Sequence, residues 1–308
     1  MNIRLLLSGL IGFAMLCAIS GPVDAQIFVA GFDTGTVAEY TTSGATVNPA
    51  LISGLDRTGG IAVSGGNLFV DYAMHNLRIG KYTTSGATLN PALITGLNSL
   101  GRIAVSGSDL FVVDAELNTE LSSIGKYTTS GATVNPFLIT ELTPRPAIAA
   151  SGDKLFVASG GSISEYTTSG ALVNPALISG LIFASGIAVS GDKLFVVDSG
   201  HFGQTGTIGE YTLSGMPVNA ALISGLDSPD QIAVSGDDLF VTSVLGGTIG
   251  KYTTSGETVN ASLISGLSSS TSIAVVSASV PDGSSTWTLL LLGLTATFGL
   301  TPLLRRRV

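Results

Sequence analysis

Cysteine is nearly absent from this 308-residue chain, and the single one, Cys17, lies close to the N-terminus. The rest of the chain therefore has no disulfide framework and no thiolate chemistry. Charged residues are scarce too, at 11% of the sequence, and the net charge is −8. Because nucleic-acid binding depends on neutralising phosphates with Lys and Arg, this composition predicts no nucleic-acid partner.

Long hydrophobic runs are missing between the two ends of the chain. No segment there approaches the roughly 18 apolar residues that span a bilayer. Glycine is plentiful instead, with 40 residues, and serine and threonine surround it. Low charge combined with many turn-forming residues excludes a long-helix protein and predicts an all-β fold of short strands.

Residues 1–25 have the organisation of a signal peptide. Arg4 precedes an apolar stretch, residues 5–19, that we expect to be the signal helix. Small residues precede the predicted cleavage by signal peptidase, which we place after Ala25. Two alternatives stay open. One is an uncleaved anchor, and the other is a lipoprotein modified at Cys17, although Leu16 is atypical of a lipoprotein signal.

The C-terminal end of the chain, residues 280–308, is a second targeting segment. Residues 287–304 carry no charge and are long enough for a transmembrane helix. Arg305, Arg306 and Arg307 follow directly, and by the positive-inside rule they keep this end in the cytoplasm. The body of the protein is then expected outside the inner membrane.

A short motif precedes that helix, namely Val280, Pro281, Asp282 and Gly283. Together with the helix and the terminal arginines, it resembles the PEP-CTERM class of bacterial sorting signals, most closely the VPDSG variant with Gly283 and Ser284 in swapped order. The resemblance implies an exosortase as a partner. It also implies an inner-membrane-anchored precursor that is cleaved near the motif and transferred to the cell surface or extracellular matrix. A plain C-terminal anchor is the alternative.

Residues 26–279 contain a six-fold repeat. A YTTSG-like block begins at Tyr40, Tyr82, Tyr127, Tyr166, Tyr211 and Tyr252. The intervals between these tyrosines, counted along the chain, are 42, 45, 39, 45 and 41. Periods of roughly 40 residues that hold several short strands are typical of propeller blades. We therefore predict a six-bladed β-propeller over this range.

Each repeat reads as four strands. In residues 186–226, IAV and LFVV flank a Ser-Gly turn, TIGEYTL follows, and VNAALIS comes last. Four other copies carry Asn-Pro in this last strand, which fits an outer edge because proline cannot donate to a ladder. The final repeat lacks its LFV strand and the predicted mature chain begins at Gln26 with one, so strands from both ends are expected to close the ring. GIAVSG…LFVVDSG…IGEY is similar to NHL repeats.

Length variation between repeats is confined to the loop between the second and third strands. The interval from each tyrosine to the valine that ends the next LFV block is constant, as from Tyr40 to Val70. The interval from that valine to the next tyrosine varies, and it is shorter at Val157–Tyr166 than at Val196–Tyr211. The connector from the fourth strand to the next blade varies in sequence, and both segments are expected on one face. Either this face binds a ligand, or its loops drift without constraint.

Five residues are candidate metal ligands at the mouth of the central channel: Asp71, His75, Asp114, Asp198 and His201. A metal site needs three or four converging ligands. The alternatives are that the aspartates terminate strands through bonds to the backbone, and that the histidines are solvated loop residues. No catalytic motif is present and no cofactor is predicted.

The residue before each tyrosine is charged with mixed sign, and we interpret this position as a solvated face. It holds Glu39, Lys81, Lys126, Glu165, Glu210 or Lys251.

The sequence favours a non-enzymatic binding or scaffold module at the cell surface, with an exopolysaccharide or surface molecule as ligand. The alternatives are a propeller hydrolase or lactonase with a metal at the channel mouth, and a purely structural matrix protein.

Overall fold

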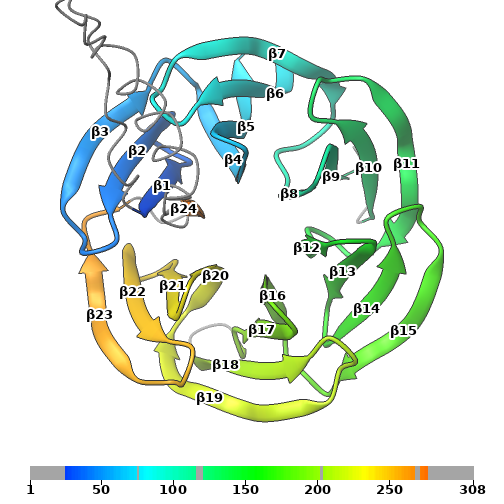
Figure 1. The fold of residues 1–308 in the computed structure, drawn as a ribbon, viewed down its shortest axis with the longest axis vertical. Helices are drawn as coiled ribbons and strands as arrows, with labels where there is room; N and C mark the ends of the chain where they lie inside the picture. Colours follow the sequence, from blue (N-terminus) through cyan, green and yellow to red (C-terminus); the bar gives the residue numbers. More distant parts are fainter. Residues whose placement is uncertain (1–24, 75, 116–120, 202–203, 268–270, 277–308) are drawn as a thin grey trace, which may run out of the picture. The chain divides into compact units, whose positions relative to one another are not determined.

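The computed structural model describes residues 25–74, 76–115, 121–201, 204–267 and 271–276. They form six four-stranded antiparallel sheets around a central axis, a six-bladed propeller (Figure 1). The predicted all-β class and blade count are confirmed. The signal peptide, the helix at 287–304 and the sorting motif lie outside the described residues and stay predictions. No helix long and apolar enough to cross a membrane occurs in the described ranges.

The strands are numbered in chain order, and each blade contributes one strand to each of four concentric positions. The innermost strands are β24 (Thr271–Val276), β4 (Arg57–Ser64), β8 (Ile103–Ser106), β12 (Ala147–Ser151), β16 (Ala184–Ser190) and β20 (Pro229–Ser235). The second are β1 (Gln26–Gly31), β5 (Asn67–Met74), β9 (Asp109–Ala115), β13 (Lys154–Ser159), β17 (Lys193–Asp198) and β21 (Asp238–Ser243).

The two outer positions follow in the same blade order. The third strands are β2 (Thr36–Thr41), β6 (Asn76–Thr83), β10 (Ser122–Thr128), β14 (Ser162–Thr167), β18 (Thr205–Thr212) and β22 (Thr248–Thr253). The outermost are β3 (Thr46–Ile52), β7 (Thr88–Leu97), β11 (Thr133–Leu142), β15 (Leu172–Ser179), β19 (Pro217–Asp227) and β23 (Thr258–Ile264). We number the blades 1 to 6, from the one built on β1 to the one built on β21.

Blade 1 closes the ring with strands from both ends of the described chain. Its order is β24-β1-β2-β3, and β24 pairs with β1 from Gln26 opposite Val276 to Gly31 opposite Thr271. The ring closure predicted from the two incomplete repeats is therefore confirmed. Because strands from both ends complete one blade, the ring has no incomplete terminal blade.

The hydrophobic core consists of six clusters, one at each boundary between neighbouring blades. The second strand of each blade buries one phenylalanine almost completely: Phe28, Phe69, Phe111, Phe156, Phe195 and Phe240. The LFV block recurs because this strand lies between the two neighbouring strands of its own sheet and between two neighbouring blades, so it is apolar on both faces.

A glycine two residues before the tyrosine decides how deeply each tyrosine is buried. A Cβ atom on Gly209 would lie 2.6 Å from the ring of Tyr211, so only glycine leaves room for the ring. The same arrangement holds for Tyr82, Tyr127 and Tyr252, and all four of these tyrosines are buried. Tyr40 and Tyr166 follow Ala38 and Ser164 instead, and both remain partly exposed.

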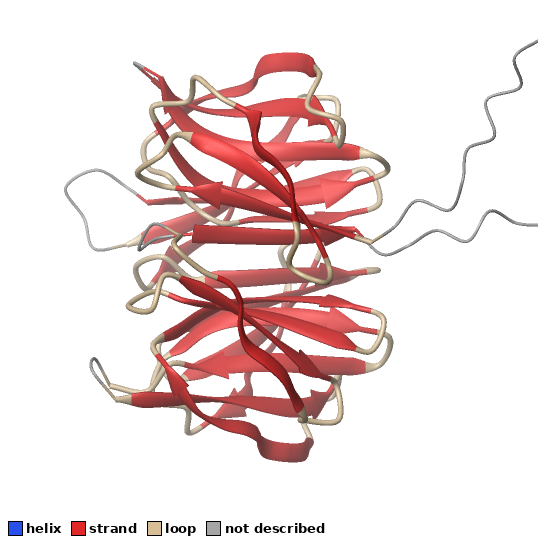
Figure 2. Cartoon of the chain, turned by 90° about the vertical axis from the view of Figure 1, so that its left-hand side faces the viewer, coloured by secondary structure: helices blue, strands red, loops and turns tan. Residues whose placement is uncertain are grey.

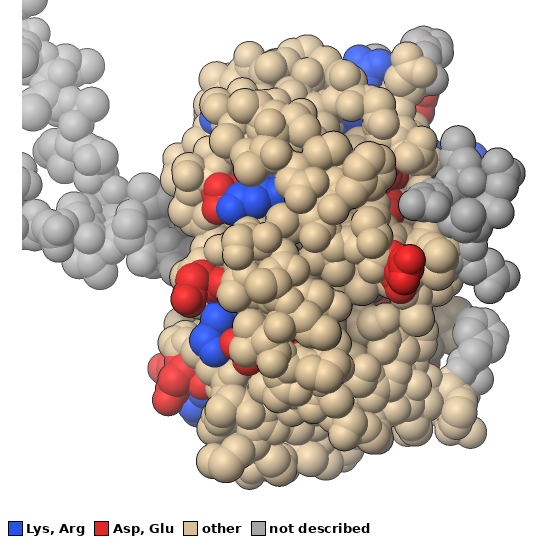
Figure 3. Space-filling model, turned by 90° about the vertical axis from the view of Figure 1, so that its right-hand side faces the viewer, with Lys and Arg blue, Asp and Glu red and all other residues tan. Residues whose placement is uncertain are grey.

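The outermost strands form the rim, and their shared asparagine shapes them. Its side chain accepts a hydrogen bond from the backbone N–H two residues later, at Asn48, Asn90, Asn135, Asn174, Asn219 and Asn260. The ladder is irregular there, which accommodates the Asn-Pro pair at the edge, as predicted. On the side of the molecule shown in Figure 3, the rim carries few charged side chains away from its borders.

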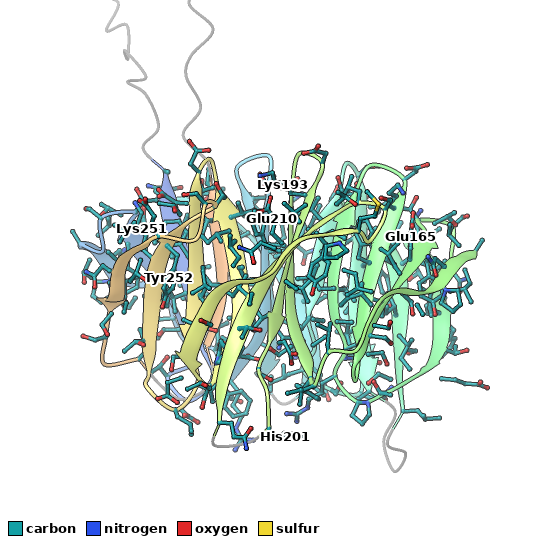
Figure 4. The ribbon with its side chains drawn as sticks, turned by 90° about the horizontal axis from the view of Figure 1, so that it is seen from below. Glu165, Lys193, His201, Glu210, Lys251 and Tyr252 are labelled. Carbon is teal, nitrogen blue, oxygen red and sulfur yellow. The ribbon has the colours of Figure 1, made fainter. Side chains whose placement is uncertain are left out.

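The charged position before each tyrosine is not a solvated face, so that interpretation was wrong. Glu39, Glu165 and Glu210 are buried. Lys154 pairs with Glu165, and the Nζ of Lys193 lies 2.7 Å from the Oε1 of Glu210 (Figure 4). The sign varies between blades because most of these residues meet a complementary partner on the second strand of their own blade.

All three lysines at this position fasten one blade to the next, and Lys81 Nζ donates to the Thr129 carbonyl of the following blade at 3.1 Å. Lys126 Nζ lies 2.8 Å from Asp109 Oδ2 and donates to the Thr168 carbonyl of the following blade at 3.0 Å. Lys251 pairs with Asp238 at 2.8 Å and reaches the Thr42 carbonyl at 3.4 Å, across the closure of the ring.

The loops divide between two faces of the disc, as the sequence predicts (Figure 2). On one face, which we call the uniform face, the YTTSG turns of blades 2 to 6 each bond to the Ser-Gly turn of their own blade, as Thr84 N does to Gly66 O at 3.0 Å. The opposite face, called the variable face, carries the loops of unequal length and the connectors between blades. There Leu55 N donates to Gly35 O, and Val244 N to Ser228 O.

Candidate ligand-binding face

Asp114 and Asp198 fix the connectors of the variable face to the backbone. Asp114 Oδ1 accepts from the N–H groups of Asn98 and Ser99, both at 2.9 Å. Asp198 Oδ1 accepts from Phe183 N at 2.8 Å, and its Oδ2 from Ile182 N at 2.9 Å. The alternative of side-chain-to-backbone bonding is confirmed for these two aspartates. Both carboxylates orient a connector between blades.

Ser159 and Ser243 occupy the same position in blades 4 and 6, and they have the same task. Ser159 Oγ shares a hydrogen bond with Thr143 Oγ1, and Ser243 Oγ donates to the Asp227 carbonyl at 2.7 Å. In four blades, therefore, the side chain two residues after the LFV valine ties down the preceding connector.

Asp71 differs from the other two aspartates, and the alternative that it terminates a strand through a bond to the backbone was wrong. It lies inside β5, one residue nearer the LFV block, where the other blades have Ala30, Val113, Ala158, Val197 or Thr242. It is completely buried, and its Oδ2 accepts from Gly101 N of the next blade. Its Oδ1 has no partner among the described residues. Burial raises the pKa of Asp71 well above the ordinary value.

The four candidate ligands that the structure describes, Asp71, Asp114, Asp198 and His201, do not form a metal site with other described residues. No group of three or more His, Cys, Asp or Glu side chains converges in the part of the chain that the structure describes. His201 is an exposed residue of the variable face, whereas Lys193 and Glu210 of the same blade lie towards the uniform face (Figure 4). His75 lies outside the described residues, so its predicted role is untested.

An ion pair joins opposite sides of the ring at its variable face. Arg102 Nη2 lies 2.8 Å from Asp230 Oδ1. Arg102 directly precedes β8 of blade 3, and Asp230 belongs to β20 of blade 6, on the other side of the ring (Figure 1). Next to it, Gln231 Nε2 donates to Ser272 Oγ of blade 1 at 2.8 Å. The ion pair joins non-consecutive blades of the ring at its variable face.

A pocket of about 460 Å³ opens on this face between blades 5 and 6. Its volume lies within the range of small-molecule sites. The apolar lining includes Ile182, Phe183, Val244 and Leu245, and the polar lining includes Ser185, Ser199, His201, Gln204 and Asp230. His201 is the one candidate ligand from the sequence that lines this pocket. Asp198 supports its wall through Ile182 and Phe183.

Arg102 and Asp230 were not singled out from the sequence. Neither was the apolar lining of the pocket, which we call the apolar wall. A signal for the wall was available in the connectors, because Ile182-Phe183 aligns with Asp56-Arg57, Asn98-Ser99 and Asp227-Ser228. The Arg102–Asp230 pair had no such signal, since the residues are 128 positions apart and meet only through the curvature of the ring.

The fold and this face define the class of the protein as a six-bladed β-propeller with one diversified loop face. No family model and no curated protein sequence matches the chain. Among solved structures, it is similar to a chain of a nidogen/laminin complex, with a TM-score of 0.66 and 15% identity, over 82% of this chain and 98% of that one.

Two enzymes also share the fold. A gluconolactonase from Xanthomonas campestris has a TM-score of 0.52 and 14% identity, over 70% of this chain and 83% of that one. A PQQ-bound aldose sugar dehydrogenase from Streptomyces coelicolor has a TM-score of 0.52 and 15% identity, over 68% and 81%. At these identities the likeness extends to the fold alone, and the fold hosts both binding proteins and enzymes.

Proposed function

We propose that the protein is an exported binding or scaffold module whose variable face recognises a surface or extracellular-matrix molecule. The observation that carries the proposal is the contrast between the faces. The uniform face repeats the same turn six times, whereas the variable face differs from blade to blade and holds the 460 Å³ pocket. Binding residues are commonly placed on loops that a rigid scaffold positions.

The test is a binding measurement with exopolysaccharide isolated from the producing cells, using matched variants of the two faces. Phe183→Ser with Leu245→Ser alters the variable face, and Ser85→Ala with Ser130→Ala alters exposed turns of the uniform face. We expect the first pair to weaken binding at least tenfold and the second to leave it unchanged. Equal affinity for all three proteins would contradict the proposal.

Export and sorting form a separate part of the proposal, supported by residues 1–25 and 280–308 of the sequence. Signal peptidase cuts after Ala25, the precursor is held in the inner membrane, and an exosortase releases or transfers it near Val280–Gly283. Cell fractionation with mass spectrometry of both termini tests this order. A surface form without Arg305–Arg307 is expected, and an intact tail that stays in the inner membrane would contradict sorting.

A lactonase-like hydrolase is the second candidate. It is favoured by the likeness to the gluconolactonase and by the buried carboxylate of Asp71 at the variable side of β5. Lactone hydrolysis assayed with and without added divalent cations decides between the two. Activity that is lost in Asp71→Asn but kept in the Phe183→Ser variant would favour the enzyme.

A further inference from the structure

The pocket between blades 5 and 6 brings together three apolar side chains that stand where a counterpart in another blade is polar. Ile182 and Phe183 begin a connector whose counterparts in the other blades begin with Asp, Asn, Thr or Ser. Leu245 stands where the loop of equal length in blade 1 has Asp33. These three side chains come from two separate loops, and all of them line the same pocket. Independent drift gives no reason for such convergence.

The apolar wall is held open to solvent rather than folded into the core. Ile182 is 50% exposed, Phe183 49% and Leu245 57%. The carboxylate of Asp198 holds the N–H groups of Ile182 and Phe183, so the connector has little freedom to turn these side chains inward. A ligand that covers this exposed apolar area removes it from water, which lowers the free energy of the complex.

Charge and hydrogen-bonding capacity inside the pocket are largely used by the protein itself. Asp230 is paired with Arg102. Ser185 Oγ donates to the Pro229 carbonyl and Ser199 Oγ to the Phe183 carbonyl. The side chains of His201 and Gln204 have no hydrogen bond to the described part of the chain, and both lie on one loop at the pocket's edge.

We propose that this pocket binds a neutral unit of that surface or matrix molecule, one with an apolar ring or chain and with hydroxyl or amide groups at one end. The apolar body covers Ile182, Phe183 and Leu245, and its polar end bonds to His201 and Gln204. A charged ligand is disfavoured, because Asp230 is already neutralised and an unpaired charge is costly to bury against this wall. The inference rests on the proposed function and specifies the ligand class that the variable face recognises.

Photoaffinity labelling of the full chain tests the ligand class. Three probes share one phenyl-diazirine body and end in a hydroxyl, a carboxylate or a trimethylammonium group, and mass spectrometry maps the labelled residues. We expect saturable labelling of the peptides that hold Phe183 and Leu245 by the hydroxyl probe. The two charged probes are expected to label them at least tenfold less.

Matched variants separate the pocket from apolar surface in general. Leu245→Glu and Phe183→Ser should each reduce labelling at least tenfold. Val47→Ser and Val218→Ser, at apolar rim positions that are 52% and 58% exposed, should leave it unchanged. Stronger labelling by a charged probe would overturn the ligand class while leaving the binding role intact. If the probe labels the rim and the pocket alike, and neither the pocket variants nor the rim variants reduce the labelling, this pocket is not a binding site. The measurement with exopolysaccharide would then still decide whether the protein has a binding role.

Discussion

At the scale of single residues, Asp71 is the position where the repeat pattern is broken most severely. A carboxyl group replaces a buried apolar side chain at the boundary of blades 2 and 3, and one of its oxygens has no partner in the described chain. Burial therefore raises the pKa of Asp71 in the folded state well above its value in the unfolded chain.

The raised pKa predicts a pH-dependent loss of stability. Asp71 contributes most favourably below its unfolded pKa, near 4, and this contribution is lost as pH rises through the folded pKa. Asp71→Asn keeps an acceptor for Gly101 N–H without the charge. We expect the variant to be more stable than the wild type at neutral pH, with a difference that shrinks towards pH 4. Denaturant unfolding across this pH range measures it, and a pH-independent difference would contradict the account.

Glu141 occupies a position that is glycine in the other five repeats. Its φ angle is 61°, in the left-handed region, close to the values of 75° at Gly225 and 80° at Gly96. A side chain in this region costs about 1–2 kcal/mol, part of which is offset by the lower entropy of unfolded glutamate. Glu141→Gly is therefore expected to stabilise the fold by about 0.5–1 kcal/mol. Thermal unfolding checks this, and a lowered Tm would contradict it.

At the scale of elements, the closing strand β24 is the part on which the ring depends. Ile273 of β24 is 6% exposed and belongs to the cluster between blades 6 and 1. Ile273→Asp buries a charge there and is expected to cost more than about 3 kcal/mol. Val259→Asp, on the exposed rim strand β23, serves as the control and should change stability by no more than about 0.5 kcal/mol. Similar unfolding midpoints for the two variants would show that β24 does not close the ring.

Most of the architecture could be predicted from the sequence because the same four-strand pattern recurs six times along the chain. The tyrosine intervals and the incomplete first and last repeats were sufficient for the blade count and for the pairing of β24 with β1. The burial of Glu165 and Glu210, and their pairing with lysines, could not be predicted from the repeat. Their partners Lys154 and Lys193 lie in another block of the repeat, and the mixed signs looked like solvent exposure until the register was known.

The site was less predictable than the fold, for a geometric reason. The aspartates looked equivalent, yet a one-residue offset buries Asp71 and leaves Asp198 to hold a connector. Alternation in a strand makes a single-residue shift reverse the direction of a side chain. The pocket depends on loops from two blades, and their proximity follows from the ring rather than from any local motif.

At the scale of the whole molecule, the Arg102–Asp230 pair links opposite blades at the variable face. Its side chains are 22% and 28% exposed, so solvent screens the interaction in part. A double-mutant cycle with Arg102→Ala and Asp230→Ala should give a coupling energy of about 1 kcal/mol that falls at high salt. Zero coupling at low salt would contradict a direct contact across the ring.

The central claim is that one face of the ring recognises ligand and the other does not. Hydrogen–deuterium exchange of the full chain, with and without isolated exopolysaccharide, tests it most directly. The account predicts slower exchange in the connectors 182–186 and 227–231, with no change in the YTTSG turns of the uniform face. Protection confined to those turns, or unchanged exchange on both faces when the ligand is bound, would contradict it.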